Sequence, residues 1–185
     1  MKKRLVSILS ALLASILLTT SALAGGSVRL GGSVRLSNEE FSLGSLIAKG
    51  TLTGLGSEDV TIVLEASGPA DIICTNPGMN DVPGHSSPRV TAIGHHGLPG
   101  SDPTRKNGKY LFNAETEDPE TISWVEGGCP NASWTARIVF INWENATIKL
   151  YKGADPSNLG NLIGEQPYTC QTSQDRTSVA CQRAD

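Results

Sequence analysis

The sequence predicts an all-β protein, built as an antiparallel β-sandwich. From Phe41 onward the apolar residues recur with a period of two, as in half-buried strands. No later stretch of ten or more residues shows the period of a helix. Turn-forming residues separate the short apolar runs, and the chain holds 20 glycines and 10 prolines. Many short strands separated by turns are typical of two packed sheets.

The first 24 residues have the features of a secretory signal peptide. Basic residues at positions 2–4 precede an apolar stretch that ends in the small-residue pattern Ala22-x-Ala24. Serine and threonine interrupt the apolar stretch, so a membrane helix is the weaker alternative. We therefore expect a signal peptide over residues 1–24, cleavage near Gly25, and a secreted, extracellular protein without membrane insertion.

Charge and size limit the classes of partner. Removing 24 of the 185 residues leaves 161, enough for one domain with a hydrophobic core. The leader holds three basic residues and no acidic ones, so 12 basic and 18 acidic residues remain, a net charge of −6. An acidic surface without basic clusters argues against nucleic acid as a partner. The expected partner is an unknown extracellular ligand, either a protein or a glycan.

Residues 25–40 are predicted to form a flexible N-terminal arm. The hexapeptide GGSVRL stands at 25–30 and is repeated without change at 31–36. Chain termini tolerate such insertions, and two copies are too few for a repeat architecture. The sandwich domain is then expected over residues 41–152, followed by a C-terminal extension with a disulfide-stapled loop at 153–185.

The first expected strands form a hairpin over residues 59–75. Alternate residues from position 60 to position 66 are apolar, as in a strand with one buried face. A turn is expected at 67–69, after which the alternation continues to Cys74. Shorter strands are expected at 89–96 and 110–115, the second after a hairpin-type turn at Asn107-Gly108.

The most regular alternation lies in residues 134–143. One face of this strand is expected to carry Trp134, Ala136, Ile138 and Phe140. The pair at 144–145 is expected to turn the chain into a return strand over 146–150, whose alternate apolar residues face inward. The number and spacing of these strands indicate a sandwich of the immunoglobulin-like type.

Four cysteines follow the leader, Cys74, Cys129, Cys170 and Cys181. An even number in an oxidising compartment normally forms disulfides, and the wide gaps do not match zinc-binding spacings. Cys74 closes one expected strand and Cys129 precedes another, which favours a Cys74–Cys129 bridge. Cys170 and Cys181 flank a polar run, which a Cys170–Cys181 bridge would staple.

Two cysteine-containing motifs carry a resemblance to a known type of protein. CTNPG at 74–78 is followed by Asn80 and a proline-containing loop, and CPNASW stands at 129–134. This combination resembles secreted bacterial immunoglobulin-like β-sandwich proteins of uncharacterised function. The likeness covers roughly Ser42 to Tyr151 and leaves out about the last thirty residues. It implies the sandwich fold and no catalytic residue.

Metal and cofactor sites are not expected. His95 and His96 are neighbours on an expected strand, so their side chains point to opposite faces. His85 lies in a separate loop, and a site completed by an aspartate would have no recognised ligand spacing. The acidic residues between 115 and 120 contain no calcium-loop pattern and are expected to form a solvated rim.

Two functional classes remain open. The favoured one is a non-enzymatic protein with a binding, adhesion or surface-structural role through its loops, especially 76–88 and 97–109. Candidate binding residues on loops or beside turns are Asn76, Asn80, His85, His95, Trp124 and Trp143. The alternative is a secreted hydrolase, for example a glycan-acting one, with a carboxylate or His–carboxylate site formed only in three dimensions. No catalytic residue is assigned.

Overall fold

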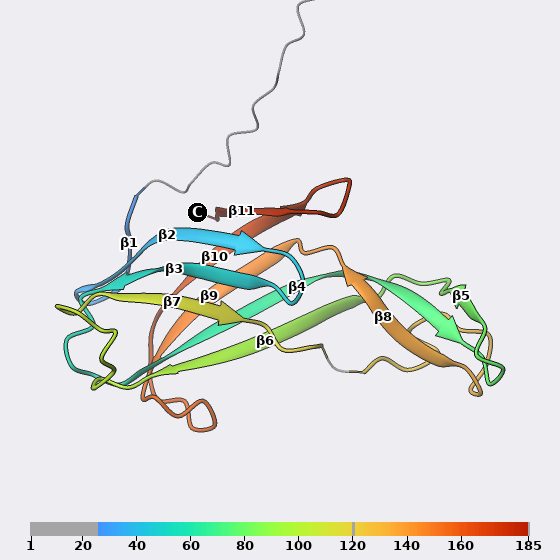
Figure 1. Cartoon of the computed structure of the whole chain (residues 1–185), viewed down its shortest axis with the longest axis horizontal. Coiled ribbons are helices and arrows are strands. Elements are labelled where there is room, and N and C mark those ends of the chain that lie inside the picture. The colour runs from blue at the N-terminus through green and yellow to red at the C-terminus, as the bar shows by residue number, and fades with distance from the viewer. Residues whose placement is uncertain (1–25, 120, 185) are drawn as a thin grey trace, which may run out of the picture.

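The computed structural model describes residues 26–119 and 121–184 (Figure 1). The expected leader therefore lies outside the described residues. The described chain forms eleven β-strands and no helix, which confirms the predicted all-β class. Accordingly, this part of the chain contains no helix long and apolar enough to span a membrane.

The strands form two antiparallel sheets. In chain order they are β1 (Val28–Gly31), β2 (Val34–Ser42), β3 (Ile47–Thr53), β4 (Val60–Thr75), β5 (Asp81–Pro83), β6 (Arg89–Leu98), β7 (Tyr110–Glu115), β8 (Thr135–Ile141), β9 (Asn145–Lys152), β10 (Leu162–Thr172) and β11 (Val179–Arg183). A four-stranded sheet has the order β1-β2-β3-β7. The seven-stranded sheet has the order β11-β10-β9-β4-β5, with β6 and β8 also paired to β4.

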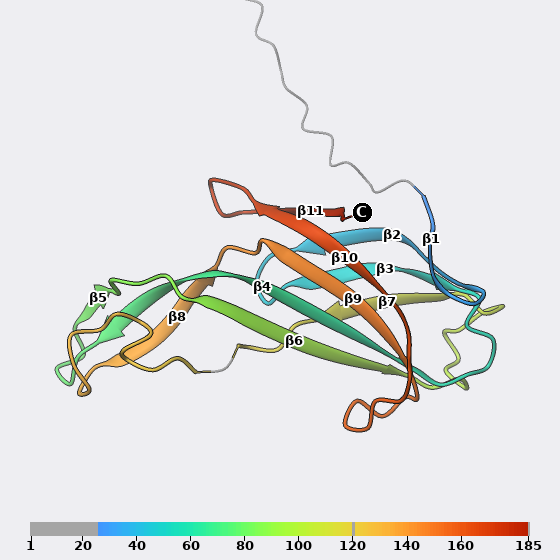
Figure 2. The ribbon, with the colours of Figure 1, turned by 180° about the vertical axis from the view of Figure 1, so that it is seen from behind.

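Strand β4 organises the larger sheet. It is 16 residues long, and its first part pairs with β6 up to Pro69 and with β9 up to Ser67. Its last part, Ala70 to Thr75, pairs with β8 and near its end with β5 (Figure 2). We call the four-stranded sheet and the part of the larger sheet that contains β6, β9, β10, β11 and the first part of β4 the body. The remaining part of the larger sheet, which contains the last part of β4 with β5 and β8, is the extension.

Each part has its own hydrophobic core. The body core lies between the sheets, an arrangement consistent with a β-sandwich, and includes Leu36, Leu52, Ile62, Leu64, Phe112, Ile148 and Leu150. The extension core is smaller and contains Ala70, Ile72, Cys74, Val90 and Cys129, with Ile122, Trp134 and Ile138 packed against it. Because several of these residues come from segment 116–134, the described residues of this segment cover the inner face of the extension.

The predicted hairpin over residues 59–75 is wrong, because these residues form the single strand β4. The pairing with β6 continues without a register shift from Val60 to Pro69. A Cβ atom on Gly68 would lie 2.0 Å from the carbonyl oxygen of Asn142. A glycine is therefore needed here for the close approach of the neighbouring chain, and not for a turn.

The predicted turn at 144–145 is also wrong. Strands β8 and β9 follow one another along the same edge of β4. Between them, the peptide N–H of Asn142 donates to the carbonyl of Pro69 at 2.9 Å, and that of Glu144 donates to Ser67 at 3.0 Å. The side chain of Trp143 enters the body core and is 1% exposed, although its position beside an expected turn suggested a surface residue.

A β-bulge changes the face on which Phe140 lies. Asp71 pairs with Phe140 and the next residue, Ile72, pairs with Ile138, so Val139 is an extra residue in β8. Adjacent residues of β4 point to opposite faces, and their partners do the same. The prediction that Phe140 shares a face with Ile138 is therefore wrong, whereas Ile138 does face the extension core.

The expected flexible arm instead forms the β1–β2 hairpin. Val28 of the first GGSVRL copy pairs with Leu36 of the second, and Arg29 lies opposite Arg35. Gly32 lies in the turn with a φ of +55°, a conformation that glycine adopts without strain. The hairpin contributes the buried side chains of Leu30, Val34 and Leu36 to the body core.

The described residues of the C-terminal segment 153–185, which was expected to lie outside the sandwich domain, are also part of the body. Strand β10 pairs with β9 from Leu162 to Thr169, and β11 pairs with β10. The two predicted disulfides are present, Cys74–Cys129 and Cys170–Cys181. The first joins β4 to the segment that covers the extension, and the second joins directly opposed residues of β10 and β11.

A buried ion pair connects the two sheets. The carboxylate of Glu39 accepts hydrogen bonds from the guanidinium group of Arg183 at 2.7 Å and from the hydroxyl of Tyr168 at 3.1 Å. Glu39 points inward because a bulge interrupts β2, and the preceding residue, Asn38, has a φ of +54°. Arg183 also donates to the carbonyl of Gly26 at 2.7 Å, so it ties the last strand to the start of the described chain.

The environment of Tyr168 predicts a loss of stability at alkaline pH. Burial, together with the nearby carboxylate of Glu39, raises the pKa of Tyr168 far above its usual value near 10. In the unfolded chain the phenol ionises near pH 10, whereas the folded protein retains the proton. The stabilisation is therefore complete below pH 10 and is lost as pH rises toward the folded pKa.

Urea unfolding measured above pH 10 checks this expectation. One such tyrosine lowers the free energy of unfolding by up to about 1.4 kcal/mol per pH unit. The Tyr168→Phe variant should lack this contribution, whereas the control Tyr151→Phe, on the half-buried face of β9, should retain it. Equal alkaline slopes for the Tyr168→Phe variant and the unchanged protein would contradict the expectation.

Candidate functional site

Two of the candidate binding residues, Asn76 and Asn80, lie in the turn between β4 and β5. The side-chain oxygen of Asn76 accepts hydrogen bonds from the peptide N–H of Asn80 at 2.9 Å and from its side-chain amide at 3.4 Å. Between them Met79 has a φ of +60° and is 83% exposed. The asparagines therefore fix the shape of the turn, and the side chain that it presents to solvent is Met79.

The other candidates lie on separate elements. His85 is exposed between β5 and β6, and His95 is exposed on β6. Trp124 is 36% exposed in segment 116–134, whereas Trp143 is buried in the body core. Among the described residues, no group of three or more His, Cys, Asp or Glu side chains is placed to hold a metal ion.

The polar side chains of loop 97–109 mainly hold the loop itself. Asp102 accepts hydrogen bonds from the hydroxyl of Thr104 at 2.6 Å and from its peptide N–H at 2.8 Å, and these bonds lower the pKa of Asp102. Arg105 donates to the carbonyls of Glu58 at 2.7 Å and Leu55 at 2.9 Å. We therefore find no convergent polar site in this loop.

A groove of about 530 Å³ lies where the body meets the extension. The turn between β2 and β3 (43–45) forms one part of its lining, and residues 116–119, 121 and 122 form another. Strand β8 lines it from Ala136 to Ile141, and Arg176 reaches it from the turn between β10 and β11. Its lining thus combines four separate segments of the chain.

Strand β8 presents an unpaired edge to this groove. Among the described strands it pairs with β4 alone. The carbonyl of Ile72 accepts a hydrogen bond from the N–H of Gly84 at 2.8 Å, so the backbone groups of Ile72 point toward β5. In an antiparallel pair, the partner of such a residue points its own groups outward. Ile138, the partner of Ile72, therefore directs its N–H and C=O away from β4.

The same alternation applies to the neighbouring residues of β8. The N–H of Ala70 donates to the carbonyl of Pro88 at 2.9 Å, on the side of β4 opposite β8. Its partner Ile141 consequently points its backbone groups outward, as does Ala136 at the other end of β8. Ala136, Ile138 and Ile141 all line the groove. The edge of β8 that lines the groove thus presents a row of main-chain hydrogen-bond donors and acceptors.

The side chains of the groove are mixed in character. Val139, the bulged residue, is 46% exposed and adds apolar surface. The guanidinium group of Arg176 lies 4.7 Å from the ring centre of Phe140 and forms an ion pair with Asp71 at 2.5 Å. Arg137 pairs with Asp81 at 3.2 Å. Both arginines of the groove thus have carboxylate partners, whereas the lining also includes the acidic side chains of Glu117 and Asp118.

Of the candidate binding residues, Trp143 lines this groove, but its side chain is buried. The sequence predicted β8 as a strand, but strand pairing decides whether an edge is free. One signal was available, because Ile138 to Ile141 form an apolar run that does not alternate with polar residues. Such a run indicates apolar surface on both faces of a strand.

Comparison of the chain with protein-family models, with curated proteins and with solved structures finds no match. The resemblance to secreted immunoglobulin-like proteins therefore stays a prediction. In the structure, the two motifs that carry it contain Cys74 and Cys129, which form the bridge across the extension core. Their observed role is thus to attach the covering segment.

Proposed function

We propose that the protein is a secreted, non-enzymatic binding protein that holds an extended polypeptide segment along β8. The observation that carries the proposal is the outward-facing backbone of Ala136, Ile138 and Ile141 within the groove. An added strand would hydrogen-bond to these groups, and its alternate side chains would contact the apolar surface around Val139. Main-chain hydrogen bonds would supply affinity, and the side-chain contacts would supply selectivity.

The form of the groove favours a single segment over the edge of another folded sheet. Two loop segments and Arg176 line the space beside β8, so a second sheet with its own side chains would meet these groups. A segment of roughly six extended residues spans about 20 Å, comparable to the exposed part of β8. We therefore infer that the ligand is an unfolded terminus or an exposed loop of another protein.

Two further features support a secreted protein of this kind. The two disulfides suit an oxidising compartment. The body consists of packed antiparallel sheets, an architecture that commonly presents binding loops and edges. Its immunoglobulin-like type, inferred from strand number and turn spacing, remains a proposal.

Selection from a random heptapeptide library displayed on phage tests the proposed function. We expect enrichment of peptides in which β-branched or aromatic residues alternate with others, since such residues favour extended strands. The Val139→Lys variant places a charge on the groove side of β8 and should bind a selected peptide at least about tenfold more weakly. Fluorescence polarisation with a labelled peptide measures the change.

Leu111→Lys is the matched control. Leu111 is 70% exposed on β7, which among the described strands pairs with β3 alone and lies outside the groove. This variant carries the same added charge on another edge strand and should bind like the unchanged protein. Equal loss of affinity in both variants, or no enrichment of strand-forming peptides, would refute the proposal. Thermal unfolding of both variants verifies that they remain folded.

A further inference from the structure

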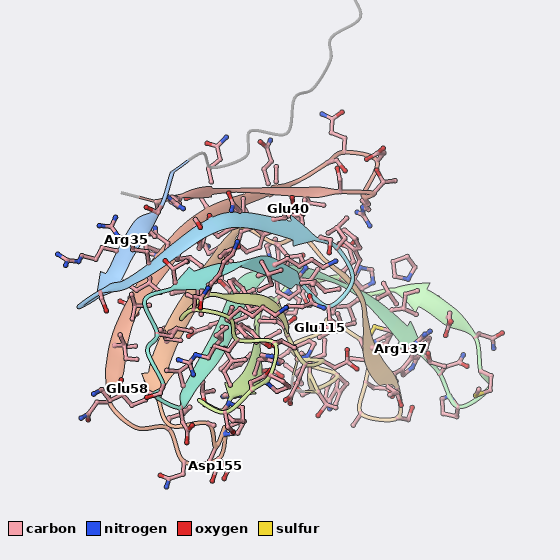
Figure 3. The ribbon with its side chains drawn as sticks, turned by 60° about the vertical axis from the view of Figure 1, so that its left-hand side comes forward. Arg35, Glu40, Glu58, Glu115, Arg137 and Asp155 are labelled. Carbon is pink, nitrogen blue, oxygen red and sulfur yellow. A yellow bond between two sulfur atoms is a disulfide. The ribbon has the colours of Figure 1, made fainter. Side chains whose placement is uncertain are left out.

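The duplicated GGSVRL segment places two arginines side by side. Its copies form the β1–β2 hairpin, in which Arg29 and Arg35 are direct cross-strand partners. Side chains of such partners leave the same face of the sheet, with Cβ atoms about 5 Å apart. Both residues are exposed, and Figure 3 shows Arg35 at the hairpin, on the periphery of the molecule.

Within the described residues, neither arginine has a carboxylate partner. The Nε of Arg29 donates to the carbonyl of Gly32 at 2.6 Å, and Nη1 of Arg35 lies 3.4 Å from the hydroxyl of Ser27. The other cross-strand neighbour of Arg35 is Thr53, which is uncharged. Four other arginines of the described chain do form ion pairs, namely Arg89, Arg137, Arg176 and Arg183.

This arrangement carries an unfavourable charge contact. Like charges directly opposite one another destabilise a sheet. An anion between the guanidinium groups would receive charge-assisted hydrogen bonds from both, and the repulsion would become attraction. The planar donor fork of arginine matches the oxygens of phosphate and sulfate groups. The chain as a whole is acidic, with a net charge of −3, so a paired positive site stands out from its surroundings.

We propose that Arg29 and Arg35 form a binding site for a tetrahedral oxyanion, namely a sulfate or phosphate ester group of a ligand. The site belongs to the four-stranded sheet and shares no residue with the groove beside β8. The proposed anion site can therefore be tested independently of the proposed peptide binding.

Isothermal titration calorimetry of the full chain tests the site with two probes, a heparin-derived hexasaccharide and inorganic tripolyphosphate. Replacing both arginines, Arg29→Gln with Arg35→Gln, should weaken binding of the better probe by about tenfold or more, because it removes charge-assisted hydrogen bonds. Affinity should also fall as salt rises to about 150 mM, since the contact is exposed. The probe that binds identifies sulfate or phosphate as the preferred group.

Lys106 and Lys109 provide a matched control, because they also face each other across a β-bridge. The double variant Lys106→Gln with Lys109→Gln removes the same charge elsewhere and should change affinity by less than about twofold. The variant Arg29→Lys with Arg35→Lys keeps the charge but loses the planar fork, so its affinity should be intermediate. Failure of both probes to bind overturns the proposal, as does an equal loss in the lysine-pair control.

Discussion

Replacing Cys74 and Cys129 together with alanine is expected to lower the free energy of unfolding by about 4 kcal/mol. The bridge closes a sequence separation of 55 residues, and the chain-entropy relation gives about 4 kcal/mol for a loop of this length. The effect should concentrate in the extension, whose small core contains both sulfur atoms. Without the bridge, few apolar contacts remain to hold segment 116–134 against β4.

Urea unfolding and amide hydrogen exchange measure this change. The control replaces Cys170 and Cys181, which are 11 residues apart, and should cost about 3 kcal/mol by the same relation. In the first variant β5 and β8 should lose protection while β2 and β3 retain it, because a small core can open locally. Unchanged stability, or an equal loss of protection in the body, would contradict the expectation.

The second large effect is expected from Arg183→Met. The side chain of Glu39 is 1% exposed, so its carboxylate would remain buried without a positive partner. Removing one member of a buried ion pair costs about 4 kcal/mol, since the remaining charge is neither solvated nor paired. The hydroxyl of Tyr168 would be the remaining side-chain donor to Glu39. Chemical denaturation at neutral pH gives the change in free energy.

A double-mutant cycle separates the charge effect from lost packing. The variant Glu39→Gln with Arg183→Met contains no buried charge at this site, so it should be more stable than Arg183→Met alone. As an exposed comparison, Arg89→Met breaks the ion pair with Glu144, whose side chain is 42% exposed. That change should cost less than about 1 kcal/mol. Additive losses at Glu39 and Arg183 would mean that the two groups are not energetically coupled.

Local sequence patterns were sufficient to predict strands and disulfides, but not how the strands connect. Residues 67–69 and 144–145 are of types that often form turns, yet the chain does not reverse direction at either segment. They lie near one another, where β8 gives way to β9 beside β4. Proline and glycine occur both at interruptions of strand pairing and in turns, so their presence does not distinguish the two. These residue types therefore indicate that the strand is irregular at this point, but the pairing with neighbouring strands determines whether the chain turns.

The candidate groove was beyond prediction for a related reason. Its lining depends on the extra residue Val139, which turns Phe140 to the face where Arg176 lies. It also depends on the pairing of β10 with β9 and not with β8, which leaves the outer edge of β8 unpaired among the described strands. Both features come from contacts between distant parts of the chain. By contrast, the alternation that predicted Ile148 and Leu150 as inward-facing is local, and both side chains are buried.

The contact between Arg183 and Gly26 determines where anything attached to the protein would stand. The two residues are hydrogen-bonded, so both ends of the described chain meet at the body, while the extension projects in another direction (Figure 1). A fusion partner or surface anchor joined at either end would leave the tip around Met79 free. The same proximity permits circular permutation, with a short linker across the ends and a new opening at the Asn107-Gly108 turn.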